Sequence, residues 1–224
     1  MVLLVILVAV RMDVLDALES WVVRPRDLRG LWARPEKELK RLAGRGAVVK
    51  VAHGYWAVVP PARRAEGGWV PPVEELALAV AQTDYGPHRV ALTHLAAARA
   101  LGAVPRALGV ATVAVPKQRP ALHTVWGMVE FTKRQVERLD LQRHAFARLT
   151  GYVTSPEQTV LDLASPRHPG VHDHEALREA LTTLAAGLDW DVVAELARAQ
   201  RKRPAVQRAA LLAAAPRPHA PERA

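Results

Sequence analysis

Residues 34–59 read RPEKELKRLAGRGAVVKVAHGYWAVV, a short helical pattern followed by two strand-like runs. Pro35 suits the first position of a helix, and Gly44 suits the residue that follows its last turn. We therefore expect a helix from Pro35 to Ala43. With about 3.6 residues per turn, its apolar and basic residues fall on opposite sides. The apolar side carries Leu39, Leu42 and Ala43, the opposite side carries Arg34, Lys37 and Arg41, and Lys40 flanks that basic side.

Two runs of β-branched and aromatic residues follow this helix, at residues 47–51 and 55–59. The connection between them, residues 52–54, is short and contains a glycine, which is typical of a hairpin turn. The sequence therefore predicts a β-hairpin. Three residues in and beside it are candidates for contacting a nucleic-acid backbone: Arg45, Lys50 and His53.

Two further helical patterns precede these elements. The first has apolar residues at helical spacing, namely Val14, Leu15, Leu18, Trp21 and Val22. The second begins at Pro25, has an apolar face, and is followed by a turn at Ala33; that face is Leu28, Leu31 and Trp32. A helix, then a helix-turn-helix, then a hairpin is the order of a winged helix-turn-helix. A basic cluster lies where the first helix of such a motif crosses the DNA backbone: Arg24, Arg26 and Arg29.

The chain has 224 residues and a formal net charge of +9, which indicates a polyanionic partner, either nucleic acid or an anionic membrane surface. The major groove of DNA admits a helix, and Lys and Arg neutralise phosphates. We therefore expect double-stranded DNA to contact the helix through Arg34, Lys37, Lys40 and Arg41, and the hairpin side through Arg45, Lys50 and His53. Because Glu36 and Glu38 lie in the same helix, a structural bundle with a solvated charged face is the alternative.

The first ten residues form an unbroken apolar run that ends at Arg11. A membrane-spanning helix needs roughly 20 apolar residues, and a signal peptide carries positive charge before its apolar core. The run fits neither, so we expect a packed element or a misplaced start, with Met12 as the true first residue. The chain has no cysteine, which excludes disulfides, thiolate nucleophiles and cysteine zinc sites.

Proline and glycine divide the chain into segments. Residues 60–72 contain Pro-Pro twice and Gly-Gly once, which indicates a linker. Residues 215–224 contain three prolines and are predicted to be a disordered tail. We therefore expect a DNA-binding domain over residues 12–59 and a second domain over residues 73–214.

The second domain has mixed patterns, which predict an α+β fold. Helices are expected at residues 73–83, 88–102, 155–164, 173–186, 189–199 and 204–214, and strands at 109–115, 125–132 and 144–153. Ser155, with Gln158 three residues later, forms a capping-box pattern. Asp189 is a further candidate helix cap.

Three segments of this second domain resemble the AbiEi family of bacterial antitoxins. They are VALTHLAAARALG at residues 90–102, ATVAVP at residues 111–116 and TSPEQTVLDLA at residues 154–164. The order of winged helix, Pro-rich connection and second domain is also similar to that family, and the resemblance covers most of the chain.

The resemblance implies a cytoplasmic, non-enzymatic antitoxin of a type IV toxin–antitoxin system, linked to abortive infection and phage defence. Such a protein represses its own operon by binding an inverted repeat in the promoter. It counters a nucleotidyltransferase-like toxin and uses no cofactor. The resemblance also implies that the second domain is needed for antitoxin activity.

Two other functions stay open at this point. A metal-dependent nucleic-acid enzyme could use the loop that holds His168, His172, Asp173 and His174, although no complete ligand set is visible and Asp173 is also placed to cap the next helix. Glu157 and Asp162 lie five residues apart, on different helix faces, so they do not form a catalytic pair.

A protein-interaction module without DNA binding is the second alternative. A basic stretch near the C-terminus is either a solvated helix face or a second phosphate-binding surface: Arg198, Arg201, Lys202, Arg203 and Arg208.

Overall fold

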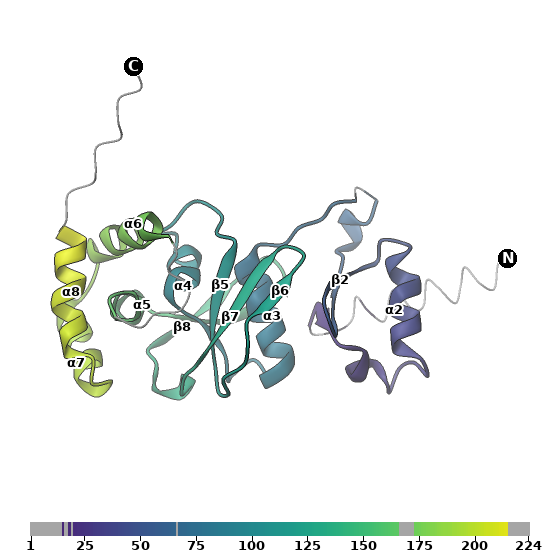
Figure 1. The fold of residues 1–224 in the computed structure, drawn as a ribbon, viewed down its shortest axis with the longest axis horizontal. Coiled ribbons are helices and arrows are strands. Elements are labelled where there is room, and N and C mark those ends of the chain that lie inside the picture. Colours follow the sequence, from purple (N-terminus) through teal and green to yellow (C-terminus); the bar gives the residue numbers. More distant parts are fainter. Residues whose placement is uncertain (1–14, 16–17, 19, 66, 166–172, 215–224) are drawn as a thin grey trace, which may run out of the picture.

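The computed structural model describes residues 15, 18, 20–65, 67–165 and 173–214. The molecule is elongated, with a small sheet and helix α2 at one end and helices α6, α7 and α8 at the other (Figure 1). A larger sheet lies between them. The apolar run before Arg11, the start at Met12, part of the first predicted helix and the predicted tail all lie outside the described residues.

The N-terminal end is a three-stranded antiparallel sheet with one helix. Its strand order is β1-β3-β2, and Val22 lies opposite Ala57 while Val48 lies opposite Val58. The predicted helix and hairpin are confirmed. The elements are β1 (Val22–Val23), the 3-10 turn η1 (Pro25–Leu28), α2 (Pro35–Ala43), β2 (Val48–Ala52) and β3 (Tyr55–Val58). Helix α2 packs its buried Leu39 and Leu42 towards η1 and β2.

Two predictions for this end were wrong in detail. Val22, expected on a helix face, lies in strand β1, because pairing with β3 completes the sheet. The second predicted helix is only the four-residue turn η1. The chain folds back directly after it, with the Trp32 amide donating to the Leu28 carbonyl at 2.9 Å, and Leu31 is left 51% exposed rather than buried.

The predicted linker takes part in the packing between the two ends of the chain. It contains one 3-10 turn, η2 (Pro61–Arg63). The Trp69 ring stands edge-on to Trp21 at 5.6 Å between centroids, and edge-on to Trp126 at 5.5 Å. The division into separate domains stays a prediction, but the core of the N-terminal sheet continues into that of the second part.

The second part is built on a six-stranded mixed sheet. Its order is β6-β7-β5-β4-β9-β8, in which β5 pairs with β7 and β4 with β9 in parallel, and the other neighbours are antiparallel. The strands are β4 (Ala91–Leu92), β5 (Val110–Val115), β6 (Leu122–Thr124), β7 (Gly127–Lys133), β8 (Leu141–Ala145) and β9 (Thr150–Thr154), with the turn η3 (Val136–Arg138) before β8.

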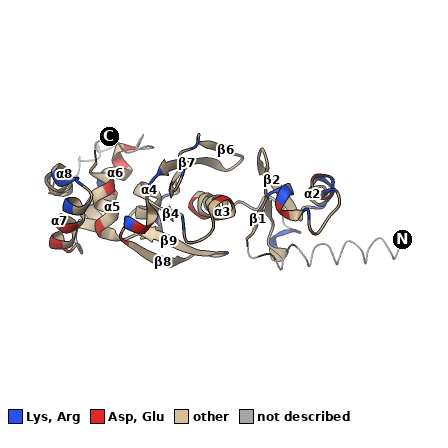
Figure 2. Ribbon diagram, turned by 90° about the horizontal axis from the view of Figure 1, so that it is seen from below, with Lys and Arg blue, Asp and Glu red and all other residues tan. Residues whose placement is uncertain are grey.

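Helices cover both faces of this sheet. Helix α3 lies between the sheet and the N-terminal end, and α4 and α5 lie on the other side (Figures 1 and 2). A second apolar cluster joins α4 and α5 to the C-terminal helices. The helices are α3 (Val73–Tyr85), α4 (His94–Ala100), α5 (Pro156–Leu163), α6 (His174–Ala185), α7 (Trp190–Ala199) and α8 (Arg203–Ala214). Among the described helices, none has the length and apolar character that crossing a membrane requires.

Most helices of the second part were predicted, but the short strand β6 was not, and two further predictions were wrong in detail. The helix expected over residues 88–102 is strand β4 followed by the shorter helix α4, because Ala91 and Leu92 fill a gap between β5 and β9. The strand expected over residues 144–153 is the hairpin of β8 and β9. The predicted caps at Asp173 and Asp189 are confirmed, because their carboxylates cap α6 and α7. The predicted capping box at Ser155 is formed only in part: the Ser155 hydroxyl accepts from the Gln158 amide at 3.1 Å, but the Ser155 amide donates to the Asp140 carbonyl instead of to the Gln158 side chain.

Candidate nucleic-acid interface

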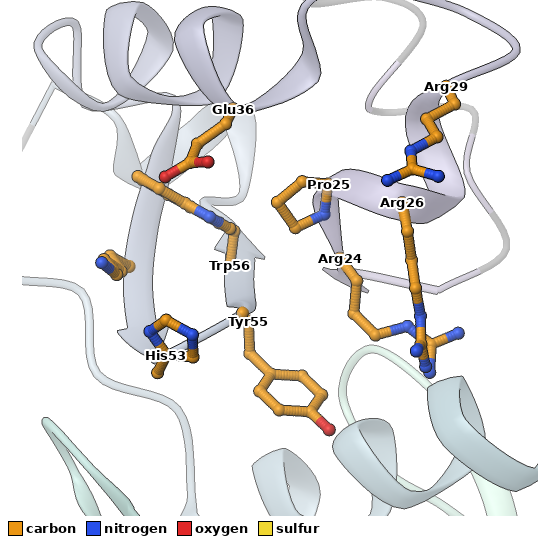
Figure 3. Close-up of a pocket in the computed structure, with 10 residues that line it drawn as sticks. Arg24, Pro25, Arg26, Arg29, Glu36, His53, Tyr55 and Trp56 are labelled. Atoms are coloured by element: carbon orange, nitrogen blue, oxygen red, sulfur yellow. The ribbon is translucent and has the colours of Figure 1, made fainter.

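A basic hollow of about 410 Å³ lies between η1, the start of α2 and the β2–β3 hairpin. The charged and polar residues that line it come from η1 and the residues beside it, from α2 and from the hairpin (Figure 3). We use the name basic hollow for the space bounded by Arg26, Arg29, Lys50, His53 and Glu36.

None of the four predicted helix cations lines the basic hollow, to which α2 contributes Glu36, and the four differ in how accessible they are. Arg34 and Lys37 are exposed, as is Lys40, which pairs with Glu36 at 3.4 Å between Nζ and Oε1. Arg41 is less available, because its Nε donates to Glu38 at 2.9 Å and its side chain is only partly exposed.

The predicted hairpin residues do not all lie together. Lys50 and His53 border the basic hollow, with the Lys50 Nζ 6.0 Å from the Trp56 ring centroid. Gly54, beside His53 in the turn, has a φ of 80°, a conformation that side-chain-bearing residues rarely adopt. Arg45 is exposed in the turn after α2 and is not among the residues that line the hollow.

Sequence reasoning gave Arg26 and Arg29 only a supporting role, but both line the basic hollow. They come from a turn that precedes α2, so their approach to Lys50 and His53 depends on the tertiary fold. The clustering of Arg24, Arg26 and Arg29 in the sequence was the available signal. Arg24 lines the hollow as well, but its guanidinium makes two hydrogen bonds of 2.8 Å to the Asp27 carboxylate and also pairs with Asp84. Arg26 lies 3.7 Å from the same Asp84 carboxylate.

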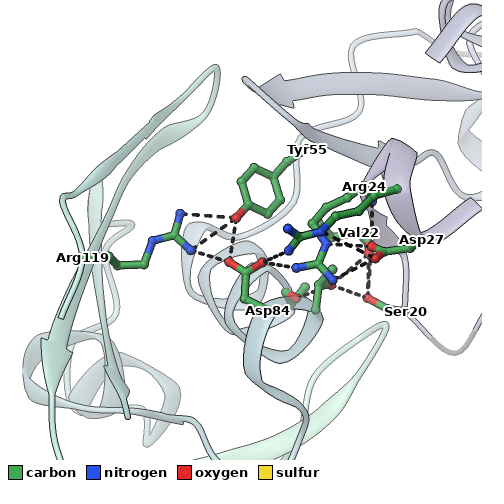
Figure 4. A network of polar contacts seen from close by, with 10 residues as sticks. Ser20, Val22, Arg24, Asp27, Tyr55, Asp84 and Arg119 are labelled. Carbon is green, nitrogen blue, oxygen red and sulfur yellow. Dashed lines mark hydrogen bonds and ion pairs between the residues drawn. The ribbon is translucent and has the colours of Figure 1, made fainter. Parts of the chain in front are cut away.

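Asp84 of α3 anchors the N-terminal end to the second part of the chain (Figure 4). Its side chain is 9% exposed and accepts hydrogen bonds from Arg24, Arg119 and the Tyr55 hydroxyl, the last at 2.6 Å. Burial, together with the Asp84 carboxylate, raises the pKa of Tyr55. The hairpin that borders the basic hollow is therefore held against α3 by charge-assisted hydrogen bonds.

A second contact reinforces this attachment. The Arg148 guanidinium lies over both Trp21 and Trp69, at 5.1 and 5.4 Å from their ring centroids, and donates to the Val58 carbonyl. The Val125 amide also donates to the Val51 carbonyl at 3.1 Å. The orientation of the basic hollow relative to the large sheet is thus fixed from several directions.

The residues considered for metal chemistry do not form a site within the described part of the chain. Asp173 caps α6 by accepting from the Ala176 amide at 2.8 Å, and it pairs with Arg106 at 3.2 Å. These interactions lower the pKa of Asp173, with the Ala176 hydrogen bond as the largest cause. His168 and His172 lie outside the described residues. Within the described ranges, no three His, Cys, Asp or Glu residues are placed to hold a metal ion.

The chain was compared with known proteins. No protein-family model matches it, and no curated protein sequence matches it. Among solved structures, it is similar to the RV2827C protein from Mycobacterium tuberculosis, with a TM-score of 0.56 and 19% sequence identity over 91% of this chain and 79% of that chain. At this identity the similarity concerns the fold alone. The chain therefore shares a mixed helix-and-sheet fold with that mycobacterial protein.

Proposed function

We propose that this chain is a DNA-binding transcriptional autorepressor whose N-terminal end, residues 12–59, is a winged helix-turn-helix. The topology supports this proposal. Strand β1 precedes the turn η1 and pairs with β3, the second strand of the hairpin. Helix α2 lies between η1 and the hairpin in the chain and keeps one charged side exposed. In a winged helix this is the position of the recognition helix, and the hairpin is the wing.

The observation that carries the proposal is the basic hollow beside α2. Arg34 and Lys37 are exposed at the start of α2, next to the hollow but outside its lining, and Lys50 and His53 line the hollow from the hairpin. Lys and Arg at such positions neutralise phosphates and release counterions, while the helix reaches base edges in the major groove. Glu36 offers an acceptor for the cytosine amino group in that groove.

We further propose that the protein is the antitoxin of a toxin–antitoxin operon, acting in the cytoplasm against a nucleotidyltransferase-like toxin. This part rests on the resemblance of residues 90–102, 111–116 and 154–164 to AbiEi antitoxins. A single helix-turn-helix gains specificity by pairing on two half-sites. The expected target is therefore an inverted repeat in the operon's own promoter, occupied by two copies of the chain.

The test is a titration of the DNA upstream of the gene with the full chain over a series of salt concentrations. The variant Arg34→Ala/Lys37→Ala should weaken binding and reduce the slope of log affinity against log salt by about two, since roughly one counterion is released per phosphate contact. The control, Lys133→Ala/Arg138→Ala, removes two charges from exposed residues of the second part. Binding that is absent, or equally weakened in both variants, would overturn the placement of the interface on α2.

The antitoxin role has its own test. Co-expression with the product of the adjacent gene should rescue growth, and a neighbour that is not toxic when expressed alone would remove this part of the proposal. DNA binding and rescue are measured separately, so either can fail without the other.

A further inference from the structure

A second charged pocket lies at the opposite end of the molecule from α2, where the turn between α7 and α8 meets the start of α4 and the end of β7. Its volume is about 490 Å³, which is within the range of small-molecule sites. Its charged or ionisable lining residues are His94, Arg134, Arg201 and Lys202. No carboxylate lines it among the described residues. We call it the Arg201 pocket.

A buried carboxylate beneath this pocket holds two of its cations in place. Asp162 is fully buried and accepts from Lys202 Nζ at 2.7 Å and from Arg134 at 3.0 Å. Thr93 and Gln158 donate to the same carboxylate at 2.9 and 3.0 Å. Burial alone would raise the pKa of Asp162, but His94, Arg134 and Lys202 together lower it. One negative charge therefore fixes two positive side chains, and positive charge remains in excess.

Arg201 adds a third cation in a different way. Its side chain is exposed and has no acidic partner among the described residues. Its position is nevertheless set by the backbone: the Lys202 amide donates to the Ala197 carbonyl at 2.7 Å, which closes the end of α7 in the manner of a Schellman motif. Arg201 therefore lines the pocket from a hydrogen-bonded turn.

The backbone conformation at this pocket is unusual. Within the described ranges, two non-glycine residues have a positive φ, His94 at 56° and Arg201 at 58°, and both line this pocket. Arg201 occupies the position after a helix where glycine is the common residue. Left-handed conformations are unfavourable for such residues, and they concentrate at binding and active sites. At Arg201 the chain thus carries an arginine at a position where the backbone conformation favours glycine.

From this arrangement we propose that the Arg201 pocket binds a small molecule that carries a phosphate or pyrophosphate group, which Arg134, Arg201 and Lys202 contact together. Arginine recognises phosphate through two parallel hydrogen bonds, and lysine adds a point charge. Arg134 and Lys202 keep further donor hydrogens beyond those directed at Asp162. The volume accommodates a nucleotide, so a nucleoside diphosphate and free pyrophosphate are both of the right chemistry.

The experiment is calorimetric titration of the full chain with inorganic pyrophosphate and, separately, with ADP. The main variant is Arg201→Gly, because glycine suits the left-handed backbone and the fold should be retained or slightly stabilised. We expect Arg201→Gly to weaken binding at least about tenfold, the loss expected from one charge-assisted contact. Arg201→Asn, which also tolerates this conformation, should give the same result if the glycine variant changes the turn.

Arg203→Ala is the matched control, since Arg203 is exposed at the start of α8 and does not line the pocket. It should leave binding of either compound unchanged. Two results would overturn the proposal: no binding of either compound by the unaltered chain, or an equal loss in Arg201→Gly and Arg203→Ala.

Measurements of DNA binding distinguish the role of the Arg201 pocket from that of the proposed recognition helix. Arg201→Gly should bind the upstream DNA as the unaltered chain does, and Arg34→Ala/Lys37→Ala should bind pyrophosphate normally. If Arg201→Gly instead loses DNA affinity while pyrophosphate titration is flat, the pocket contacts the DNA backbone and the small-molecule proposal is wrong.

Discussion

Glu36 places a carboxylate in the basic hollow, among side chains that otherwise favour phosphate. Its pair with Lys40 joins two side chains that are each 64% exposed, so it contributes little stability. Glu36→Gln removes a charge that repels DNA phosphates and weakens an acceptor for cytosine. We expect tighter binding to a scrambled duplex, on the order of threefold, and a smaller preference for the promoter.

Parallel titrations of promoter and scrambled DNA at one salt concentration measure this effect. Glu195→Gln, an exposed site on α7, is the charge-matched control. Weaker binding of Glu36→Gln to both duplexes would contradict a repulsive role for Glu36.

At the other end of the molecule, Asp162 makes the stability of the fold depend on pH. Its pKa is lower in the folded chain than in the unfolded chain, so the carboxylate stabilises the fold above the ordinary Asp pKa of about 4. That stabilisation is lost as the pH falls from there through the folded pKa. Asp162→Asn should reduce the free energy of unfolding at pH 7 by on the order of 3 kcal/mol, because it leaves Arg134 and Lys202 without their buried partner.

Denaturant unfolding of both proteins between pH 7 and pH 2.5 measures the difference. The difference should shrink in the acid range. Glu74 and Glu75 act in the opposite direction, since burial raises the pKa of each, but they are common to both proteins and cancel in the comparison. A difference that is constant with pH would show that Asp162 is not the titrating group.

At the scale of elements, helix α2 depends on a small core. Leu42 is fully buried between the helix and the N-terminal sheet, whereas Leu31 in the preceding turn is largely exposed. Leu42→Ala should lower the free energy of unfolding by about 2–5 kcal/mol and DNA affinity with it. Leu31→Ala, the same substitution at the exposed site, should stay within about 0.5 kcal/mol. Chemical denaturation measures both, and equal effects would contradict this packing of α2.

The same elements show what the sequence could predict. Helix α2 and its hairpin follow from local signals, namely Pro35, Gly44 and Gly54. Strands β1 and β4 have two residues each, too short for any periodic pattern, and they exist because distant strands pair with them. In the candidate interface, too, some features follow from local sequence and others depend on the tertiary fold. Its helix residues were predicted from spacing, but the approach of Arg26 and Arg29 to the hairpin required the tertiary fold.

At the scale of the whole molecule, the two ends of the chain are joined through Asp84. This one carboxylate receives Arg24 and Tyr55 from the N-terminal end and Arg119 from the loop before β6. Because the three partners come from separate segments, the carboxylate couples the N-terminal end to the large sheet. The tryptophan contacts of Trp69 supply the apolar part of the same joint.

Asp84→Ala should therefore loosen the joint without unfolding either end. Losing hydrogen bonds from charged donors to a nearly buried carboxylate costs about 1.5–3 kcal/mol at the joint. We expect thermal unfolding to broaden or split into two transitions, small-angle scattering to show a larger radius of gyration, and cleavage within residues 60–72 by trypsin to accelerate. Asp191→Ala, at an exposed site on α7, should change none of these. If the two variants behave alike, the apolar contacts of Trp69 hold the ends together and the Asp84 network is secondary.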